Sequence, residues 1–319
     1  MIHVLISRYE LSEYLFSDLD GIDTIFVPVR KHNSLPHRLV KAIYYKICPK
    51  VYSNYLSKEV SDRLKTIPQN DTLIVIGEDT YFYWVLSHLC KHVKYKVAYF
   101  WNSCVSAKSQ KTCTTIKKNK NRAKAIVEYV RLLGFTMATF DSADAEKYSM
   151  EYFPQFYRLY PEGNLLKENA KYDFFFCGRD KGRKGQICKI QERLSKYGIC
   201  NFIIIPEKSP DAIGYFDYLD VLKESKVICE FVQNGQFGLT MRTLEALFFH
   251  KKLITTNSSI KNEDFYNPKN ILIITEQTSE EELRNFLNCP MSAVDVSVIH
   301  KYGVYSLLNF LNTKCHEAL

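Results

Sequence analysis

The chain has 319 residues, of which 46% are hydrophobic and 24% are charged, and its formal net charge is +8. This is the composition of an ordinary globular protein, long enough for two hydrophobic cores. No run approaches the roughly 18 to 20 uncharged apolar residues that span a bilayer, and residues 1–7 lack the basic start and small-residue exit of a cleavable signal. These features exclude a membrane-spanning chain, and we expect a cytoplasmic protein.

Short apolar runs alternate with helical patterns along the first half of the chain, as in a mostly parallel α/β sheet. The runs predict strands at 2–7, 23–28, 72–77, 96–101 and 136–140, and the helical patterns predict helices near 35–48, 80–91 and 121–133. The segment 160–164 breaks both patterns and predicts a linker.

The alternation restarts after the linker. It predicts strands at 172–177, 200–205, 227–231, 252–255 and 271–274, with helices between about 185 and 196, at 216–224 and after Gly238. We therefore expect an α/β fold with two doubly wound, Rossmann-like domains facing a cleft. The expected ranges are 1–163 for the first domain, 164–295 for the second, and 296–319 for a helical tail packing back on the domains.

Cysteine usage indicates thiols rather than cross-links. The ten cysteines form no CxxC pair and show no metal-ligand spacing, and Cys90, Cys177 and Cys229 lie inside apolar runs. We predict buried free thiols, with neither disulfides nor a structural metal.

Two basic regions account for much of the positive charge. The segment 108–124 carries seven cations and no acidic residue, and the segment 37–46 mixes cations with tyrosines and aliphatic residues. These patterns fit loose attachment to an anionic membrane surface, or else a solvated helix face and a loop. Nucleic acid ranks lowest as a partner, because no recognition-module signature accompanies the charge.

The most informative stretch runs from 237 to 257. A turn containing Gly238 opens a short helix with Thr240, Met241 and Arg242 in its first turn, and an apolar strand follows at once. In an open α/β sheet the N-terminus of such a helix lies at the ligand crevice, where its free N–H groups and dipole favour phosphate. Glu245, one turn further in, is placed to accept hydrogen bonds from ribose hydroxyls.

A second basic turn, at 176–185, follows the first predicted strand of the second domain. It holds three glycines, one of them Gly178, and four cations, including Arg179 and Arg183. Glycine lets the backbone approach an anion, and arginine forks onto phosphate oxygens. The spacing matches neither the P-loop nor GxGxxG, and an exposed charged loop is the plainer alternative. Two basic turns at strand ends of one domain together indicate a diphosphate site.

Over residues 172–274 the chain resembles bacterial GT-B glycosyltransferases of lipopolysaccharide and surface-polysaccharide biosynthesis. The resemblance is carried by the Cys-Gly-Arg turn at 177–179, by the run at 218–227 and above all by the segments 235–247 and 251–257. It implies an enzyme that binds a nucleotide-sugar donor in the C-terminal domain and an acceptor in the N-terminal domain, with no cofactor and no essential metal.

Carried over by position, the resemblance also assigns site residues. Gly178 and Arg179 would line the diphosphate, Thr240 to Arg242 would lie under the phosphates, and Glu245 would hold the ribose. Many retaining members pair two glutamates eight positions apart, but position 237 holds Phe. Retention or inversion at the anomeric centre therefore stays open.

An inverting reaction needs a base for the acceptor hydroxyl. The candidates are Glu78 and Asp79, directly after a predicted strand, and Glu10, after the first strand; Asp79 equally suits a helix cap. Cleft or acceptor candidates are Asn102, Asp141 and Asp144, with a turn or helix caps as the alternatives. The histidines form no dyad in the sequence, although partners distant along the chain stay open.

Three function classes follow. The leading one is a hexosyl- or deoxyhexosyltransferase acting on a lipopolysaccharide core, O-antigen or capsular glycan, or on a lipid-linked glycan, in the cytoplasm or at the cytoplasmic face of the inner membrane. The second is another nucleotide-sugar enzyme, such as an epimerase, whose paired acidic and histidine machinery the sequence does not show. The third is a non-catalytic binder of anionic glycan or nucleic acid, which would leave both phosphate turns unexplained.

Overall fold

The computed structural model describes residues 1–28, 56–77, 80–101, 124–158, 170–207, 209, 213–233 and 238–318. The chain divides into two compact units, each described here by itself. Unit 1 comprises Met1–Pro154 and Leu307–Leu319, and unit 2 comprises Gln155–Ser306. The division thus falls after Pro154, compared with the predicted boundary at 163, and the predicted tail 296–319 is shared between the units at Leu307.

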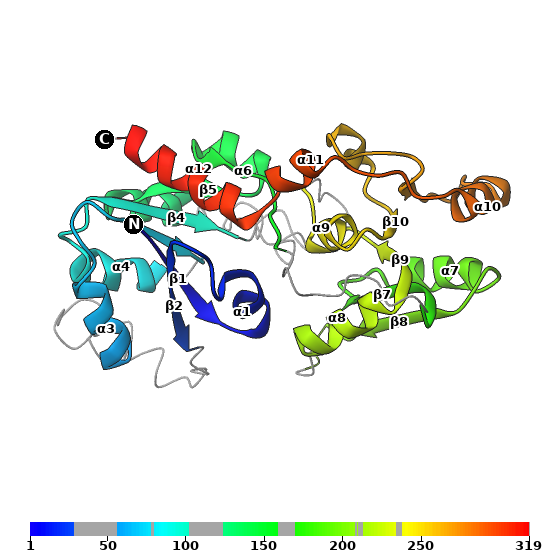
Figure 1. Ribbon diagram of the computed structural model, residues 1–319, viewed down its shortest axis with the longest axis horizontal. Coiled ribbons are helices and arrows are strands. Elements are labelled where there is room, and N and C mark those ends of the chain that lie inside the picture. Colours follow the sequence, from blue (N-terminus) through cyan, green and yellow to red (C-terminus); the bar gives the residue numbers. More distant parts are fainter. Residues whose placement is uncertain are drawn as a thin grey trace. The chain divides into compact units, whose positions relative to one another are not determined.

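Unit 1 is built on a six-stranded sheet in the order β2-β1-β3-β4-β5-β6, and every neighbouring pair is parallel (Figure 1). The strands are β1 (Ile2–Arg8), β2 (Ile22–Pro28), β3 (Thr72–Ile76), β4 (Tyr95–Phe100), β5 (Thr136–Thr139) and β6 (Glu151–Tyr152). The first five confirm the predicted strands. The two-residue β6 is too short to give a sequence pattern.

Helices connect these strands. They are α1 (Glu10–Phe16), α3 (Lys58–Lys65), α4 (Thr80–Leu89), residues 124–132 and α6 (Ser142–Tyr148). The helix α12 (Val304–Glu317) contributes its part from Leu307 onward to unit 1. The predicted helix near 35–48 and the linker at 160–164 lie outside the described residues.

The core of unit 1 follows from strands that are buried on both faces, which is why they read as continuous apolar runs. Every second residue, such as Leu5 in β1 and Leu73 and Val75 in β3, belongs to one buried cluster with Leu64 of α3 and Leu86 of α4. The intervening residues, such as Val4 and Ile74, are equally buried and point to the other face of the sheet.

Unit 2 repeats the design with five parallel strands in the order β11-β10-β9-β7-β8. The strands are β7 (Tyr172–Arg179), β8 (Cys200–Ile205), β9 (Ser225–Glu230), β10 (Lys252–Thr255) and β11 (Ile271–Ile273). The helices are α7 (Lys184–Leu194), α8 (Tyr215–Lys223), α9 (Met241–Phe248), the 3₁₀ helix η3 (Ser258–Asn262), α10 (Glu280–Asn288) and α11 (Val296–Lys301).

Three consecutive phenylalanines in β7 show how the sheet of unit 2 is covered. Phe174 and Phe176 share a buried cluster with Ile187 of α7 and Phe286 of α10. Phe175 points to the opposite face, where its ring lies 5.3 Å from that of Tyr218 in α8. Helices therefore cover both faces of the sheet.

The two units share one strand order. Counted along each unit, the first strand lies between the second and the third, and the later strands extend the sheet beyond the third. This 2-1-3-4-5 order is that of a doubly wound sheet, whose winding reverses between its first and third strands. The predicted fold class, α/β with two doubly wound, Rossmann-like domains, is confirmed. The reversal points are β1/β3 in unit 1 and β7/β9 in unit 2.

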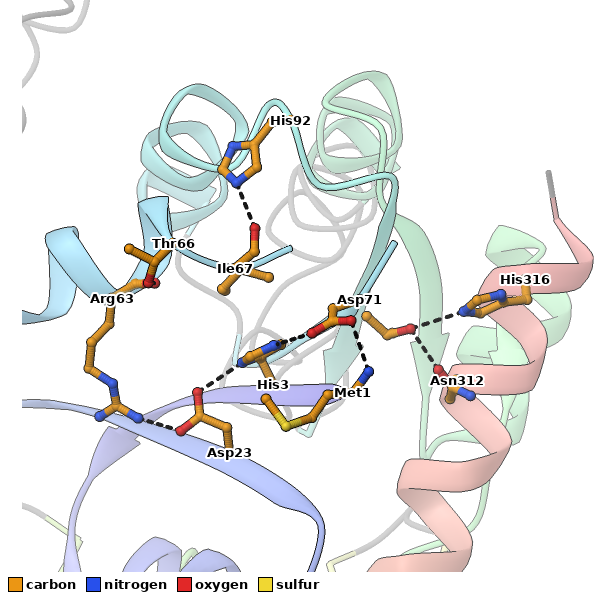
Figure 2. A network of polar contacts seen from close by, with 11 residues as sticks. Met1, His3, Asp23, Arg63, Thr66, Ile67, Asp71, His92, Asn312 and His316 are labelled. Atoms are coloured by element: carbon orange, nitrogen blue, oxygen red, sulfur yellow. Dashed lines mark hydrogen bonds and ion pairs between the residues drawn. The ribbon is translucent and has the colours of Figure 1, made fainter. Parts of the chain in front are cut away.

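A buried histidine organises the amino edge of the sheet in unit 1. Figure 2 shows His3 of β1 between two carboxylates, with its Nδ1 2.8 Å from Asp23 and its Nε2 3.0 Å from Asp71. Arg63 of α3 donates to the other oxygen of Asp23, and the Met1 amino group lies 2.9 Å from Asp71. Because ionised carboxylates only accept hydrogen bonds, a ring nitrogen of His3 that carries a proton donates it to the carboxylate beside it.

Hydrogen bonds at the amino edge of this sheet also hold the C-terminal helix α12 in place. The hydroxyl of Thr72, next to Asp71 in the chain, is 2.6 Å from the side-chain oxygen of Asn312 and 3.1 Å from Nε2 of His316 in α12 (Figure 2). The His316 ring stacks on Tyr95 with 3.6 Å between the centroids.

The three predicted thiols Cys90, Cys177 and Cys229 are buried and free, as expected.

The Asp71 carboxylate makes the stability of unit 1 sensitive to acid. Hydrogen bonds from His3 and from the Met1 amino group lower the pKa of Asp71 below its usual 3.8. The ionised carboxylate therefore stabilises the fold above that pH, and the contribution is lost as the pH falls through the lower folded-state pKa. We expect urea unfolding to show Asp71→Asn less stable than wild type at neutral pH, with the gap closing as the pH falls below 3.8.

Asp62 provides the matched control, because its carboxylate is exposed and pairs with Lys65 at 3.3 Å. Asp62→Asn is expected to change the free energy of unfolding little at any pH. A gap between wild type and Asp71→Asn that stays constant or widens in acid would contradict the assigned role of Asp71.

Candidate functional site

The candidate site of unit 2 lies where its winding reverses. β7 pairs with β8 on one side and with β9 on the other, so the segments that follow β7 and β9 leave the same edge of the sheet towards different connections. Ligands of open α/β sheets bind at the carboxyl ends of the strands at this point. The ends of β7 and β9, together with the start of α9, therefore form the candidate binding edge of unit 2.

A buried carboxylate at the end of β9 holds this region together. Glu230 is 0% exposed and accepts hydrogen bonds from the hydroxyls of Thr240, Thr243 (2.8 Å) and Thr255 (2.5 Å). Thr240 is the N-cap of α9, Thr243 lies in its first turn, and Thr255 ends β10. One side chain thus fixes the start of α9 to two neighbouring strands.

The start of α9 is capped in the usual way. The Thr240 hydroxyl accepts a hydrogen bond from the backbone N–H of Arg242 at 3.2 Å, and Gly238 and Met241 flank the cap as half-buried residues. The remaining N–H groups of the first turn have no partner within the helix, because there is no preceding turn to supply carbonyls. They carry the positive end of the helix dipole to the edge of the sheet.

Arg242 lies across the end of β7. Its Nε and Nη2 donate to the carbonyl of Cys177, at 3.0 and 2.5 Å, and its guanidinium carbon is 5.2 Å from the centre of the Phe176 ring. A Cβ added to Gly178 would lie 2.5 Å from Nη2 of Arg242. Glycine at 178 therefore leaves room for the guanidinium beside the strand in this position. The Nη1 group has no partner among the described residues.

Arg183 spans the reversal point itself. It donates to the carbonyls of Asp180 (3.1 Å) and Arg179 (2.6 Å) after β7, and to that of Phe231 after β9. Burial lowers the pKa of Arg183, and the nearby charge of Arg242 lowers it further. The charges of Asp180 and Glu230 act in the opposite direction. The site therefore concentrates positive charge at a partly desolvated position, where an anion would be attracted most strongly.

Arg179 bridges the ends of β7 and β8. Its Nη1 contacts the carbonyls of Pro206, Glu207 and Ser209 at 3.3, 3.2 and 3.0 Å. Its Nε and Nη2 have no partner among the residues that the structure describes. Like Nη1 of Arg242, they are donors available to a ligand. The structure thus brings Gly178, Arg179, Arg183 and Arg242 to one edge of unit 2.

Glu245 lies on the same helix but points into protein. It is 2% exposed, and its oxygens accept hydrogen bonds from Tyr215 (2.9 Å) and Tyr218, while Tyr157 lies 2.6 Å from the Tyr215 hydroxyl. Burial raises the pKa of Glu245, opposed by the tyrosine hydrogen bonds and by Arg242. The carboxylate expected to hold ribose is engaged by tyrosines here, and its ribose role stays a prediction.

Sequence reasoning missed the partners of both carboxylates. Glu230 ends an otherwise apolar strand, where an acidic residue needs a buried partner. The position of Glu230 at the end of an apolar strand could therefore have indicated that its carboxylate is buried with a partner. No local pattern indicates that Tyr215 and Tyr218 of α8 meet Glu245 of α9, because the two helices are joined only through β9.

The candidate residues of unit 1 are only partly described. Glu10 is exposed and is the first residue of α1, directly after β1 at the reversal point of unit 1. Asp141 caps α6, its side chain accepting from the N–H of Asp144 at 3.0 Å, and Asp144 is buried in the first turn. Asp141 thus has the capping role that was the alternative to lining a cleft. Glu78, Asp79 and Asn102 lie outside the described residues.

The described part of the chain contains no group of three or more His, Cys, Asp or Glu side chains placed to hold a metal ion. Among the same residues, no helix has the length and apolar character needed to cross a membrane. Of the basic segment 108–124 only Lys124 is described, and its ammonium lies 3.6 Å from Glu128 one helical turn away.

Comparison with known proteins adds little to these observations. No protein-family model and no curated protein matches the chain. Among solved structures, the chain is similar to an alpha,alpha-trehalose-phosphate synthase (UDP-forming) from Burkholderia vietnamiensis, with a TM-score of 0.45 and 9% identity. The match covers 99% of this chain and 97% of that one. At this level of similarity it carries no argument about activity.

Removal of Glu230 should unfold the edge of unit 2. In Glu230→Leu three threonine hydroxyls lose their acceptor, so we expect the free energy of unfolding to fall by about 3 kcal/mol or more. The measurement is chemical denaturation followed by circular dichroism. Glu192→Leu, an exposed glutamate on α7, is the control and should change stability by no more than about 0.5 kcal/mol. Equal effects of the two substitutions would refute the anchoring role.

Glu245 should give the opposite pH dependence to Asp71. Its pKa is raised above 4.5 by burial, so the stability that it contributes is present below that pH and is lost as the pH rises through the folded-state pKa. As the pH rises from 4.5 through the folded-state pKa, the free energy of unfolding of wild type should fall relative to that of Glu245→Gln. Glu192→Gln should show no such drift. A wild-type advantage that grows with pH would show that Glu245 is stabilised as an ion.

Proposed function

We propose that the protein is a glycosyltransferase that uses a nucleotide-activated sugar as donor. The observation that carries the proposal is the convergence of Arg179, Arg183 and Arg242 with the N-terminus of α9 at the reversal point of unit 2. Unpaired N–H donors, close backbone approach at Gly178 and a helix dipole suit a nucleotide diphosphate. The resemblance of residues 172–274 to GT-B glycosyltransferases supports sugar transfer as the reaction.

In the proposed reaction, the oxygen of an acceptor hydroxyl forms a bond to the anomeric carbon while the bond from that carbon to the diphosphate breaks. The electron pair leaves with the diphosphate, and the hydroxyl proton passes to a base. Arg179, Arg183, Arg242 and the start of α9 stabilise the negative charge that develops on the leaving nucleotide. Glu10, Glu78 and Asp79 remain the proposed bases. The donor is a substrate, and the proposal assigns no cofactor and no metal.

The proposed acceptor is a glycan or lipid-linked glycan of a lipopolysaccharide core, O-antigen or capsule. The net charge of +8 and the basic segments 37–46 and 108–124 favour an anionic acceptor or membrane surface. The corresponding place of action is the cytoplasm, at the cytoplasmic face of the inner membrane. Nucleic acid is not proposed as a partner.

Donor binding is testable by thermal-shift titration with a panel of nucleoside diphosphates and nucleotide-sugars. A ligand that binds the folded state raises the melting temperature in proportion to ln(1 + [L]/Kd). We expect one nucleotide class to give a saturable rise. In Arg242→Met the affinity should fall about tenfold or more, because a charge-assisted hydrogen bond to phosphate is lost.

Lys189→Met is the matched control. It also removes one cation from unit 2, but Lys189 is an exposed residue of α7 whose ion pair with Glu276 spans 3.9 Å. Its nucleotide affinity should equal that of wild type. No response to any nucleotide, or equal losses in both variants, would overturn the proposal. Transfer of radiolabelled sugar from the selected donor to isolated surface glycan then tests the reaction itself.

A further inference from the structure

Unit 1 contains a pocket that the proposed transfer reaction does not use. Its volume is about 380 Å³, and it lies at the amino edge of the sheet, where β4 and β5 begin. The lining residues come from four parts of unit 1: Lys94, Lys96, Arg131, Gly134, Phe135, Thr136, Met137, Ser149, Glu151, Cys315 and Ala318. The carboxyl ends of the strands, with Glu10 and Asp141, lie at the opposite edge of the same sheet.

The charge of the lining favours an anion. Lys94, Lys96 and Arg131 contribute three positive charges and Glu151 one negative charge, which leaves +2. None of the three cations has a carboxylate within ion-pair distance among the described residues. Elsewhere in the same unit, exposed cations such as Lys65 and Arg63 do pair with aspartates.

Two of the cations are held in position while donors remain available. The Nη2 of Arg131 donates to the carbonyls of Tyr148 and Ser149 at 2.8 and 3.0 Å. Its Nε and Nη1 have no partner among the described residues. The Nζ of Lys96 donates to the Val93 carbonyl at 3.1 Å, which uses one of its three protons.

Lys96 is also partly removed from water. It is half-buried, and burial lowers its pKa, which nearby Cys90 and Cys315 oppose. Burial raises the pKa of the Cys315 thiol, so that wall of the pocket is neutral rather than a counter-ion. Gly134, whose φ is +82°, lies beside the Lys96 ammonium, and a Cβ added to it would lie 3.9 Å from Nζ of Lys96. A bound anion would supply the negatively charged partner that this ammonium lacks among the described residues.

The remaining lining sets the size and polarity of the ligand. Ser149 offers a hydroxyl, the Thr136 hydroxyl donates to the Cys315 sulfur at 3.8 Å, and the largely buried Phe135 and Met137 offer a small apolar surface. A volume of about 380 Å³ falls within the range of small-molecule sites, about 300 to 1,000 Å³, and exceeds the need of a bare ion. A phosphate monoester carries about −1.5 to −2 charges at neutral pH, which matches the net charge of the lining.

We propose that this pocket binds a small soluble phosphomonoester, with the phosphate on Lys94, Lys96 and Arg131 and the organic part over Phe135 and Met137. The site is separate from the nucleotide site of unit 2, and the proposal does not depend on glycosyl transfer. Because Cys315 of α12 and Ala318 directly after the helix form one wall, ligand binding stabilises the attachment of the C-terminal helix to unit 1.

The test is isothermal titration of the full chain with glycerol 3-phosphate and with inorganic phosphate, at constant ionic strength. Saturable binding is expected, tighter for the ester than for inorganic phosphate. Lys96→Met should weaken it about tenfold or more, because one charge-assisted contact is removed. Glu151→Gln should tighten it, because the one opposing charge is removed. Arg242→Met should leave it unchanged, which separates this pocket from the nucleotide site.

Lys91→Met is the matched control for net charge, since Lys91 is exposed, lies close to Lys94 in the chain and does not line the pocket. Its affinity for the ester should equal that of wild type. Absence of saturable binding would overturn the proposal, as would equal weakening by Lys91→Met and Lys96→Met or weakening by Glu151→Gln. Circular dichroism of each variant verifies that the fold is retained.

Discussion

The binding edge of unit 2 depends on one buried carboxylate. Glu230 ends β9 without exposure to water and accepts hydrogen bonds from Thr240, Thr243 and Thr255. A buried carboxylate is costly unless its oxygens are satisfied, so the three threonines and the glutamate are needed together. Their arrangement fixes the first turn of α9 against β9 and β10, and the position of Arg242 follows from it.

Positive charge at this edge is held by backbone carbonyls rather than by acidic side chains. Arg179, Arg183 and Arg242 all donate to carbonyls at the ends of β7, β8 and β9. A carbonyl orients a guanidinium without neutralising it, so the charge remains available to an anion. The pocket of unit 1 uses the same device, with Arg131 on two carbonyls and Lys96 on a third. By contrast, the carboxylates Asp23 and Asp71 occupy the amino edge around His3.

Both units use the same doubly wound strand order, which gives each a reversal point. In unit 2 that point is occupied by the arginine cluster, and in unit 1 it is followed directly by Glu10. This division, with cations in the second unit and a carboxylate in the first, agrees with a proposal in which one unit binds a diphosphate and the other supplies a base. Hydrogen bonds near water lower the pKa of Asp71, whereas removal from water raises the pKa of Glu245, so the two carboxyl groups shift in opposite directions.

The fold class and every strand except the two-residue β6 could be predicted from the amino-acid sequence, because parallel strands buried on both faces leave apolar runs that are readable locally. The sequence also located the arginine turns, since glycine and arginine at strand ends have a local signature. The partners became visible only in the folded chain: Glu230 with threonines from two segments, the start of α9 and the end of β10, Glu245 with Tyr215 and Tyr218, and His3 with two aspartates. These pairs join residues 10 to 68 positions apart in the chain, and strand order, which no local pattern encodes, brings them together.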